Sequence, residues 1–391
     1  MVQDIRTVYD AHVLKSYARY PVAFASGNGC KLWDSNGKEY IDFMSGIGVC
    51  SIGHAHPTWV AAVVAQAGEL AHVSNLYYTE PGGHLAARLC YLSGMSGVFF
   101  GNSGAESVEG LIKLARKYSK DKYGSGRSTI VTLVDSFHGR TIAALSATGQ
   151  DKFHQHFEPF LQGFRHVAAN DMAALEAQGD DVCALLIEMI QGEGGVNPLE
   201  NEYVKKAAAL CAERDWLLMI DEVQTGIGRT GEWFAFQDYG ISPDAIAFAK
   251  GIAGGLPLGG FIVNKKLHDV LKPGDHGSTY GSNLVSCAAA LATLAILEPI
   301  LPEVKEKGEY IRKRVETMNL PHITDIRGRG LMIGLQVKGI APADLNLKLL
   351  EAGLASLTAG SDVIRFLPPL IINKKDIDAG LDILESVMRK L

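Results

Sequence analysis

The sequence lacks the features of disulfide-rich, metal-bound and membrane-spanning proteins. Its six cysteines are spread over 391 residues without a CxxC pair, which excludes a disulfide framework and a cysteine zinc site. The longest apolar stretch, 287–297, is too short to cross a bilayer and predicts a buried helix. The first residues carry charges throughout and have no apolar core of a signal peptide. We therefore expect a cytoplasmic protein with reduced thiols.

Runs of basic residues are also missing. The net charge is −6 and the pI is about 6.1, which excludes nucleic acid and anionic membranes as electrostatic partners. What the chain does have is 47% hydrophobic and 20% charged residues, the composition of a protein that buries a substantial core. At this length we expect one large and one small domain.

The order of apolar patterns divides the chain into three parts. Residues 58–300 alternate helix-period segments with short apolar runs, which predicts a large α/β domain whose mostly parallel sheet has helices on both faces. Residues 301–391 predict a smaller α+β domain, and residues 1–57, with a hairpin turn at 35–37, predict an N-terminal segment that is part of it. The elements expected after residue 300 are helices at 303–318, 342–352 and 375–390 and strands at 330–337 and 362–367.

Two apolar runs in the middle of the chain end on acid–base residues. The run 217–220 ends on Asp221 and Glu222, and the run 245–249 ends on Lys250. Such runs predict strands buried on both faces, and ligands of open α/β sheets lie beyond the carboxyl ends of the strands. A lysine in a dry pocket can form a Schiff base with an aldehyde, and an acid can pair with a pyridinium nitrogen, as pyridoxal phosphate chemistry requires. A Walker-B-like acid with a surface lysine is the alternative.

A turn at 101–106 follows the apolar run 98–100. Its residues Ser103 to Glu106 have the S-x-x-E form of a capping box, which opens a helix. Small residues at such a helix start allow a phosphate to reach backbone N–H groups, although an ordinary capped helix has the same pattern. A P-loop is excluded because no GxxxxGK[ST] pattern occurs.

Two further groups allow two interpretations each. His54 and His56 form an HxH pair, which predicts a structural turn before a helix near Thr58 rather than a metal site, because no third ligand is near in sequence. Arg365 lies inside an apolar run, where it needs an anion. That anion is either a protein carboxylate or the carboxylate of a substrate.

With these residues in place, the chain resembles the class III (ω-amino) aminotransferases, which are fold-type I enzymes with pyridoxal 5'-phosphate. The resemblance extends from Tyr17 to Pro369, and within the family it is strongest to the enzymes that act on N-acetylornithine. The motifs that carry it, in the family's order and with similar spacing, are GNSGAE, SFHGRT, QGEGG, IDEVQTGIGRTG, AFAKG and HGSTYG.

The resemblance implies a role for each cofactor-binding residue. Lys250 would hold the cofactor as a Schiff base and move the proton during transamination, and Asp221 would keep the pyridine nitrogen protonated. Val223 and Phe137 would enclose the ring, and Gln224 would bond its phenolic oxygen. A homodimer follows, because the phosphate would also contact a threonine of the other subunit. The remaining cofactor residues are Ser103, Gly104, Ala105 and Glu188 of one chain and Thr279 of the other.

The resemblance also implies the substrate contacts. Arg365 would bind the α-carboxylate of glutamate or 2-oxoglutarate, and Glu193 would pair with Arg365 while an ω-amino substrate is bound. Arg140 would bind the far carboxylate of acetylornithine. Ile47 stands where ornithine δ-aminotransferases have a tyrosine, which favours a substrate with an acylated α-amine. The other substrate residues implied are Tyr17 and Ser278.

The expected reaction transfers the δ-amino group of N2-acetyl-L-ornithine to 2-oxoglutarate. The alternatives in the family are 4-aminobutyrate, succinylornithine and N-succinyl-diaminopimelate aminotransferases. A mutase-like isomerase would not need an oxo-acid and so does not explain Arg365, and a non-catalytic DNA-binding regulator would need a DNA-binding segment. The chain departs from the usual family pattern, without loss of a reacting group, at 107–110, Met189 and 282–284.

Overall fold

A computed structural model describes residues 4–391, and its largest element is a seven-stranded sheet. The strand order is β4-β12-β11-β10-β7-β5-β6, and β12 alone runs antiparallel to its two neighbours. The predicted mostly parallel sheet is therefore confirmed. Its strands are β4 (Gly97–Gly101), β5 (Thr129–Leu133), β6 (Phe164–Val167), β7 (Val182–Ile187), β10 (Leu217–Asp221), β11 (Ala245–Phe248) and β12 (Gly259–Val263).

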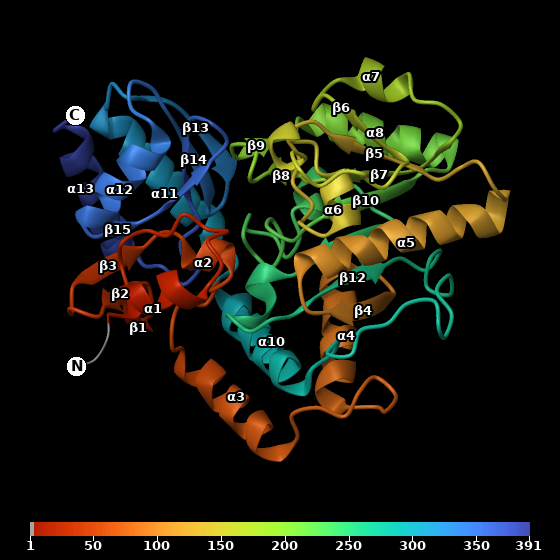
Figure 1. Ribbon diagram of the computed structural model, residues 1–391, viewed down its shortest axis with the longest axis horizontal. Helices are drawn as coiled ribbons and strands as arrows, with labels where there is room; N and C mark the ends of the chain where they lie inside the picture. Colours follow the sequence, from red (N-terminus) through yellow and green to blue (C-terminus); the bar gives the residue numbers. More distant parts are fainter. Residues whose placement is uncertain (1–3) are drawn as a thin grey trace.

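Helices cover both faces of this sheet, as expected from its apolar runs (Figure 1). All five residues of β10 are buried, and they alternate between two separate cores: Leu218 and Ile220 pack in one, Leu217 and Met219 in the other. The helices of this part are α3 (Pro57–Glu69), α4 (Glu80–Ser93), α5 (Gly104–Tyr123), α6 (Ile142–Ala147), α7 (Met172–Glu176), α8 (Asn201–Arg214), α9 (Phe236–Tyr239) and α10 (Leu284–Leu297).

The last ninety or so residues form a second, smaller α/β unit, in the blue region of Figure 1. It contains the antiparallel sheet β13-β14-β17-β16, and its three helices match the predicted ranges to within two residues at each end. The elements are α11 (Glu303–Met318), β13 (Ile323–Arg329), β14 (Met332–Val337), α12 (Pro342–Glu351), β16 (Leu357–Ala359), β17 (Val363–Phe366) and α13 (Lys374–Met388).

The N-terminal segment lies against this smaller unit, as Figure 1 shows by the red and blue elements side by side. The hairpin expected around 35–37 is confirmed, and its second strand pairs in parallel with a two-residue strand from the C-terminal part. The division into 1–57, 58–300 and 301–391 stays a prediction. The remaining elements are α1 (Ile5–His12), β1 (Phe24–Asn28), β2 (Lys31–Asp34), β3 (Glu39–Asp42), α2 (Ser45–Gly48), β8 (Ile190–Gln191), β9 (Asn197–Pro198) and β15 (Leu354–Ala355).

The HxH pair has the structural role that its sequence context predicts. His54 Nε2 lies 2.8 Å from Asp42 Oδ2, and the His54 backbone exchanges two hydrogen bonds with Gly29. The bond to Asp42 raises the pKa of His54 to about 10. The following residues open α3 at Pro57, whose ring suits the first helical position. His54 therefore ties the hairpin to the start of α3.

The apolar segment 287–297 forms most of α10, which packs against α3 and α4 in the core, as predicted. Among residues 4–391, no single helix has both the length and the hydropathy of a membrane span. One bent pair, Leu284–Ile300 with Glu303–Met318, meets both only when the two helices are taken together across a 66° bend.

Candidate active site

A cavity of about 420 Å³ lies beyond the carboxyl ends of the central strands. Asp221 ends β10, Lys250 lies two residues after the end of β11, and these strands are parallel neighbours with Asp221 in register with Ala247. The predicted placement of acid and lysine at one pocket is confirmed. The lining residues that matter below are Ser103, Gly104, Ala105, Phe137, His138, Arg140, Glu188, Asp221, Val223, Gln224 and Lys250.

Asp221 is held by a buried histidine. His138 Nδ1 lies 2.8 Å from Asp221 Oδ2, and the Val223 N–H donates to Oδ1 over 3.0 Å. Both His138 and Asp221 are buried. Within residues 4–391 the second ring nitrogen of His138 has no hydrogen-bond partner. The imidazole therefore fixes the orientation of the Asp221 carboxylate at the cavity wall.

Lys250 is the one lysine of the cavity lining. Burial lowers the pKa of its amine; the neighbouring charge of Arg365 also lowers it, while Glu193, Asp221 and Glu188 oppose the change. Its backbone has a φ of 42°, an unusual value for a residue with a side chain. A lowered pKa makes the neutral, nucleophilic amine available, as a Schiff-base lysine requires.

The N-terminus of α5 opens on the same cavity. The Ser103 hydroxyl accepts from the Glu106 N–H over 3.2 Å and donates to the Glu106 carboxylate, which in turn accepts from the Asn102 N–H. The capping box is thus confirmed, except that its carboxylate bonds Asn102 rather than the cap residue's own N–H. The next N–H groups, of Gly104 and Ala105, have no intrahelical acceptor and lie at the positive end of a 20-residue helix.

Gly104 has no room for a side chain. A Cβ there would lie 2.7 Å from Cγ1 of Val223. The helix start and Val223 are therefore in direct contact, and the backbone rather than a side chain faces the cavity. This is the close backbone approach that anion binding needs.

Glu188 and Glu222 are both buried, but only Glu188 lines the cavity. Burial raises the pKa of Glu188 to about 7, although it accepts from the Phe137 N–H over 2.9 Å. Burial likewise raises the pKa of Glu222 to about 7, and its carboxylate accepts from the Thr225 hydroxyl and the Phe236 N–H. Glu222 therefore holds the loop after β10, and of the Asp221–Glu222 pair only Asp221 lines the cavity.

Arg365 is paired with a protein carboxylate in this structure. Its guanidinium donates to Glu193 over 2.7 Å and to Gln224 Oε1 over 3.0 Å, and the side chain is 2% exposed. Burial would raise the pKa of Glu193, but the charge and hydrogen bond of Arg365 lower it. A substrate carboxylate can replace the Glu193 carboxylate on the same guanidinium. Arg365 can therefore pair with a protein carboxylate in the free protein and with a substrate carboxylate when substrate is bound.

Arg140 is in the opposite state: it lines the cavity, is exposed, and forms no hydrogen bond or ion pair within the described part of the chain. Ser278 accepts from the Asn102 side chain at the α5 start, over 3.2 Å. Tyr17 and Ile47 are 75% and 45% exposed and lie outside the cavity lining, as does Thr279. Their substrate and cofactor roles stay predictions.

His138 is the main site residue that sequence reasoning missed. It lies in the SFHGRT motif directly after Phe137, yet its partner Asp221 is 83 positions away. No sequence pattern around a histidine at a strand-end turn indicates which acid it contacts in the folded protein.

The donor set fits pyridoxal 5'-phosphate. The free N–H groups at the α5 start suit a phosphate. Asp221, oriented by His138, suits a pyridinium nitrogen, and Lys250, with its lowered pKa, suits an aldehyde. Phe137 and Val223, the two residues expected to enclose the ring, both line the cavity.

Comparison with protein families matches residues 13–388 to the class-III aminotransferases. Two curated relatives are similar over nearly the whole chain. The acetylornithine aminotransferase of Haemophilus ducreyi is 50% identical over 384 residues, which cover 97% of each chain. That of Caldanaerobacter subterraneus subsp. tengcongensis is 47% identical over 385 residues, 97% of this chain and 98% of the relative.

Solved structures share the whole fold. The ornithine aminotransferase of Toxoplasma gondii, whose crystals hold pyridoxal phosphate at partial occupancy in the active site, superposes with a TM-score of 0.94 at 32% identity; the match covers 99% of this chain and 94% of that one. The acetylornithine aminotransferase of Elizabethkingia anophelis gives a TM-score of 0.88 at 31% identity, over 99% and 98%.

Proposed function

The chain belongs to the class-III aminotransferases, and we propose on this basis that it transfers the δ-amino group of N2-acetyl-L-ornithine to 2-oxoglutarate. The products are N-acetylglutamate 5-semialdehyde and glutamate, a step of arginine biosynthesis. The observation that carries the proposal is the cavity in which Lys250 and the Asp221–His138 pair face the start of α5, with Arg140 unpaired at the same cavity.

Pyridoxal phosphate, when bound, supplies an aldehyde for amines and a ring that withdraws electrons from the substrate carbon. Lys250 Nζ is the group that can take the proton from this carbon and return it, because burial favours its neutral form. Asp221 would pair with the ring nitrogen, and His138 keeps its carboxylate from rotating away. The N–H groups of Gly104 and Ala105 would bind the phosphate.

One cavity must accept two unlike substrates in turn. Glutamate carries a carboxylate next to its reacting carbon, and acetylornithine does not. We assign the first carboxylate to Arg365, from which Glu193 would be displaced, and the far carboxylate of acetylornithine to Arg140. With acetylornithine bound, the Glu193–Arg365 ion pair remains and leaves no buried charge alone.

Succinylated donors are the second candidate, and one contact favours it. Lys152 Nζ lies 4.8 Å from the centre of the Phe153 ring, on which the Arg140 guanidinium also rests. A second cation on this side of the cavity could receive the extra carboxylate of a succinyl group. Lys152→Ala would then lower the rate with succinylornithine and leave that with acetylornithine unchanged.

We also propose that the enzyme is a cytoplasmic homodimer in which Thr279 of the partner subunit completes the phosphate site. Two observations support this. All six cysteines are free, as in a reducing compartment. The loop that carries Thr279 lies outside its own cavity and joins a surface with exposed aromatic side chains.

A single-turnover measurement tests the main proposal. The cofactor-loaded protein is mixed with one amino donor and no oxo acid, and the loss of the aldehyde form is followed by absorbance. Conversion should be fast with acetylornithine and slow with ornithine and 4-aminobutyrate. A preference for 4-aminobutyrate would keep the transaminase chemistry but reject the substrate assigned to Arg140.

Lys250→Ala is the control for the chemistry. The variant should lose both the visible absorbance of the covalently held cofactor and all turnover, because no other lysine lines the cavity within residues 4–391. Lys152→Ala, which removes a lysine outside the lining, should keep both the absorbance and the turnover of acetylornithine. If the purified wild-type protein took up no pyridoxal phosphate, the proposed function would be wrong.

A further inference from the structure

Arg140 differs from Arg365 in what holds it. Arg365 is fixed by a carboxylate and an amide. The Arg140 guanidinium has no such partner within residues 4–391, and its only contacts of this kind are with two aromatic rings. Its central carbon lies 3.9 Å from the centre of the Phe153 ring and 5.5 Å from that of Phe137. The shorter distance is that of a guanidinium stacked on the ring face.

Phe153 itself does not line the cavity. It is half-buried behind Arg140, and its ring meets the Phe137 ring edge to face at 5.7 Å and 77°. The three side chains form one continuous contact: Phe137 on the cavity wall, Phe153 behind it, and Arg140 resting on Phe153 with its donors free. A substrate carboxylate can therefore use those donors without first displacing a protein anion.

The backbone around Phe153 is tied to the turn that carries Arg140. The Gln150 side chain donates to the Ser136 carbonyl over 3.0 Å, and the Gly149 N–H donates to the Ser136 hydroxyl over 3.1 Å. On the other side, His154 Nε2 lies 2.9 Å from the carbonyl of Leu145 in α6. The ring is thus held at a fixed place relative to Arg140, as a positioning residue must be.

We propose that Phe153 is a specificity-determining positioning residue, whose ring holds Arg140 ready for the carboxylate of the amino donor. The inference rests on the proposed function, since it requires that Arg140 binds the far carboxylate of the donor. Without the ring, the flexible arginine side chain must give up its conformational freedom when the substrate binds. The loss should appear in donor binding and not in the chemical step.

The test compares two donors that differ only in the carboxylate: N-acetylornithine and N-acetylputrescine, in which a hydrogen takes the place of that group. The single-turnover rate constant divided by the half-saturating concentration is measured for each, and the ratio of the two values is the readout. Wild type should favour acetylornithine, and Arg140→Gln should remove most of this preference. In Phe153→Leu the ratio should fall about two- to fivefold, the size of an exposed cation–π contact.

Two variants separate positioning from a structural role. Phe153→Tyr keeps a ring face and should keep the wild-type ratio. Phe157→Leu makes the same change at a 54% exposed phenylalanine of the same segment and should leave both donors unaffected. In Phe153→Leu the maximal rate with acetylornithine should stay close to wild type while the half-saturating concentration rises.

Two results would overturn the inference. If Phe153→Leu lowered the values for both donors equally, Phe153 would be a structural residue only, and the role of Arg140 would stand. If wild type showed no preference for acetylornithine, or if Arg140→Gln kept the wild-type preference, Arg140 would not bind the carboxylate. The assignment of Arg140 in the proposed function would then fail together with this inference.

Discussion

At the scale of single residues, the two arginines that we assign to the two substrates differ in burial and in their partners. Arg365 is buried and neutralised by Glu193, whereas Arg140 is exposed and stacked on a ring. An unpaired buried charge is costly, and Glu193 compensates the buried charge of Arg365. An exposed arginine needs no carboxylate partner, since water solvates its charge. The difference in burial explains why only Arg365 needs an internal anion.

Arg365→Ala should therefore damage one half-reaction far more than the other. Glutamate and 2-oxoglutarate lose the cation for their α-carboxylate, and we expect their half-reaction to weaken by on the order of 2–4 kcal/mol. In our assignment acetylornithine does not contact Arg365, so its half-reaction should change less. Single-turnover kinetics of each half-reaction measure this, and an equal loss in both would contradict the assignment.

Glu193→Gln is the complementary change. It keeps Arg365, which binds the substrate carboxylate, and removes the Glu193 carboxylate that competes for it. In this variant Arg365 has no carboxylate partner from residue 193. A substrate carboxylate then meets no charged competitor for the guanidinium. We expect 2-oxoglutarate to half-saturate this variant at a lower concentration than wild type. A higher concentration would mean that Glu193 helps the oxo acid to bind.

Residue-scale prediction from sequence works where chain order alone sets the position. Asp221 and Lys250 follow adjacent strands, and residues 103–105 open a helix, so all of them meet at one sheet edge. His138 and Phe153 act through contacts made by folding, with Asp221 and Arg140, and no local pattern specifies those partners.

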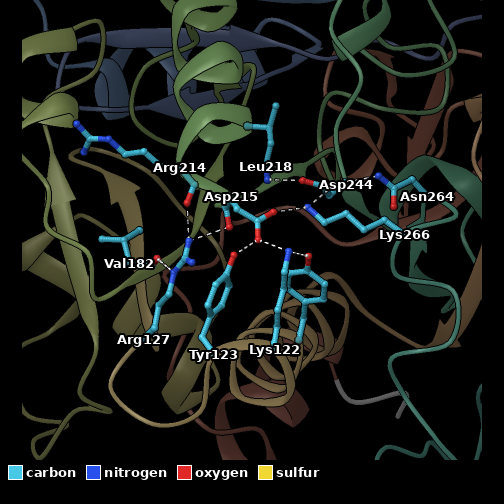
Figure 2. A network of polar contacts seen from close by, with 11 residues as sticks. Lys122, Tyr123, Arg127, Val182, Arg214, Asp215, Leu218, Asp244, Asn264 and Lys266 are labelled. Carbon is cyan, nitrogen blue, oxygen red and sulfur yellow. Dashed lines mark hydrogen bonds and ion pairs between the residues drawn. The ribbon is translucent and has the colours of Figure 1, made fainter.

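At the scale of elements, a polar network joins the ends of α5 and α8 to β12 (Figure 2). Asp215, at the left-handed C-cap of α8, accepts from Lys122 Nζ over 2.6 Å, from the Tyr123 hydroxyl, and from Lys266 Nζ over 3.2 Å. Arg127 donates to the Asp215 carbonyl over 2.8 Å. One carboxylate thus holds the far end of the helix whose start faces the cavity.

Asp215→Asn removes this charge and keeps a residue that tolerates the left-handed backbone, with φ near 50°. Burial opposes ionisation of Asp215, but the bonds from Lys122, Tyr123 and Lys266 lower its pKa to about 2 from 3.8. A lowered pKa stabilises the fold above pH 3.8, and this contribution is lost as the pH falls toward 2. At pH 7 the variant should lose about 1–2 kcal/mol of unfolding free energy.

Urea unfolding of wild type and Asp215→Asn between pH 7 and about pH 3 measures this difference, which should shrink at the acid end of the range. Asp180→Asn is the matched control, since Asp180 is exposed and forms no hydrogen bond or ion pair within the described chain. A difference between wild type and Asp215→Asn that stays constant down to pH 3 would argue against an electrostatic origin.

The sequence predicts a helix or strand whose pattern lies within one segment, but it does not predict which strands pair with each other. The sequence pattern predicts a helix at 303–318, and this range matches α11. By contrast, β15 has two residues and exists only because it pairs with β3, more than 300 positions earlier. The reversed direction of β12 likewise depends on its neighbours β4 and β11 and has no local signature.

At the scale of the whole molecule, one surface carries exposed apolar side chains that a single chain leaves in water. Leu76, Tyr77, Tyr78 and Tyr280 are 85%, 70%, 108% and 63% exposed. Asn75 joins their two segments, because its amide donates to the carbonyls of Ser278 and Gly281 over 3.0 Å each. Exposed large apolar side chains on two adjoining segments are typical of a protein interface.

Tyr78→Glu should therefore weaken the proposed dimer. Sedimentation should give two chains of 42.0 kDa for wild type and a larger share of single chains for the variant. Tyr91→Glu, at a tyrosine of α4 that is 76% exposed and outside this surface, should remain dimeric. A wild-type protein that sediments as one chain would reject the dimer.

A dimer with shared active sites also predicts complementation: two chains with different inactivating substitutions can together form one complete site. Lys250→Ala removes the lysine of its own cavity, and Thr279→Ala removes a phosphate contact that we place in the cavity of the partner subunit. In a mixed dimer, the Thr279→Ala chain keeps its own Lys250 and receives Thr279 from the Lys250→Ala partner, which makes one complete site. Random pairing of equal amounts should restore about a quarter of the wild-type activity at low cofactor concentration. If Thr279 served its own subunit, the mixture would be no more active than the average of its two parents.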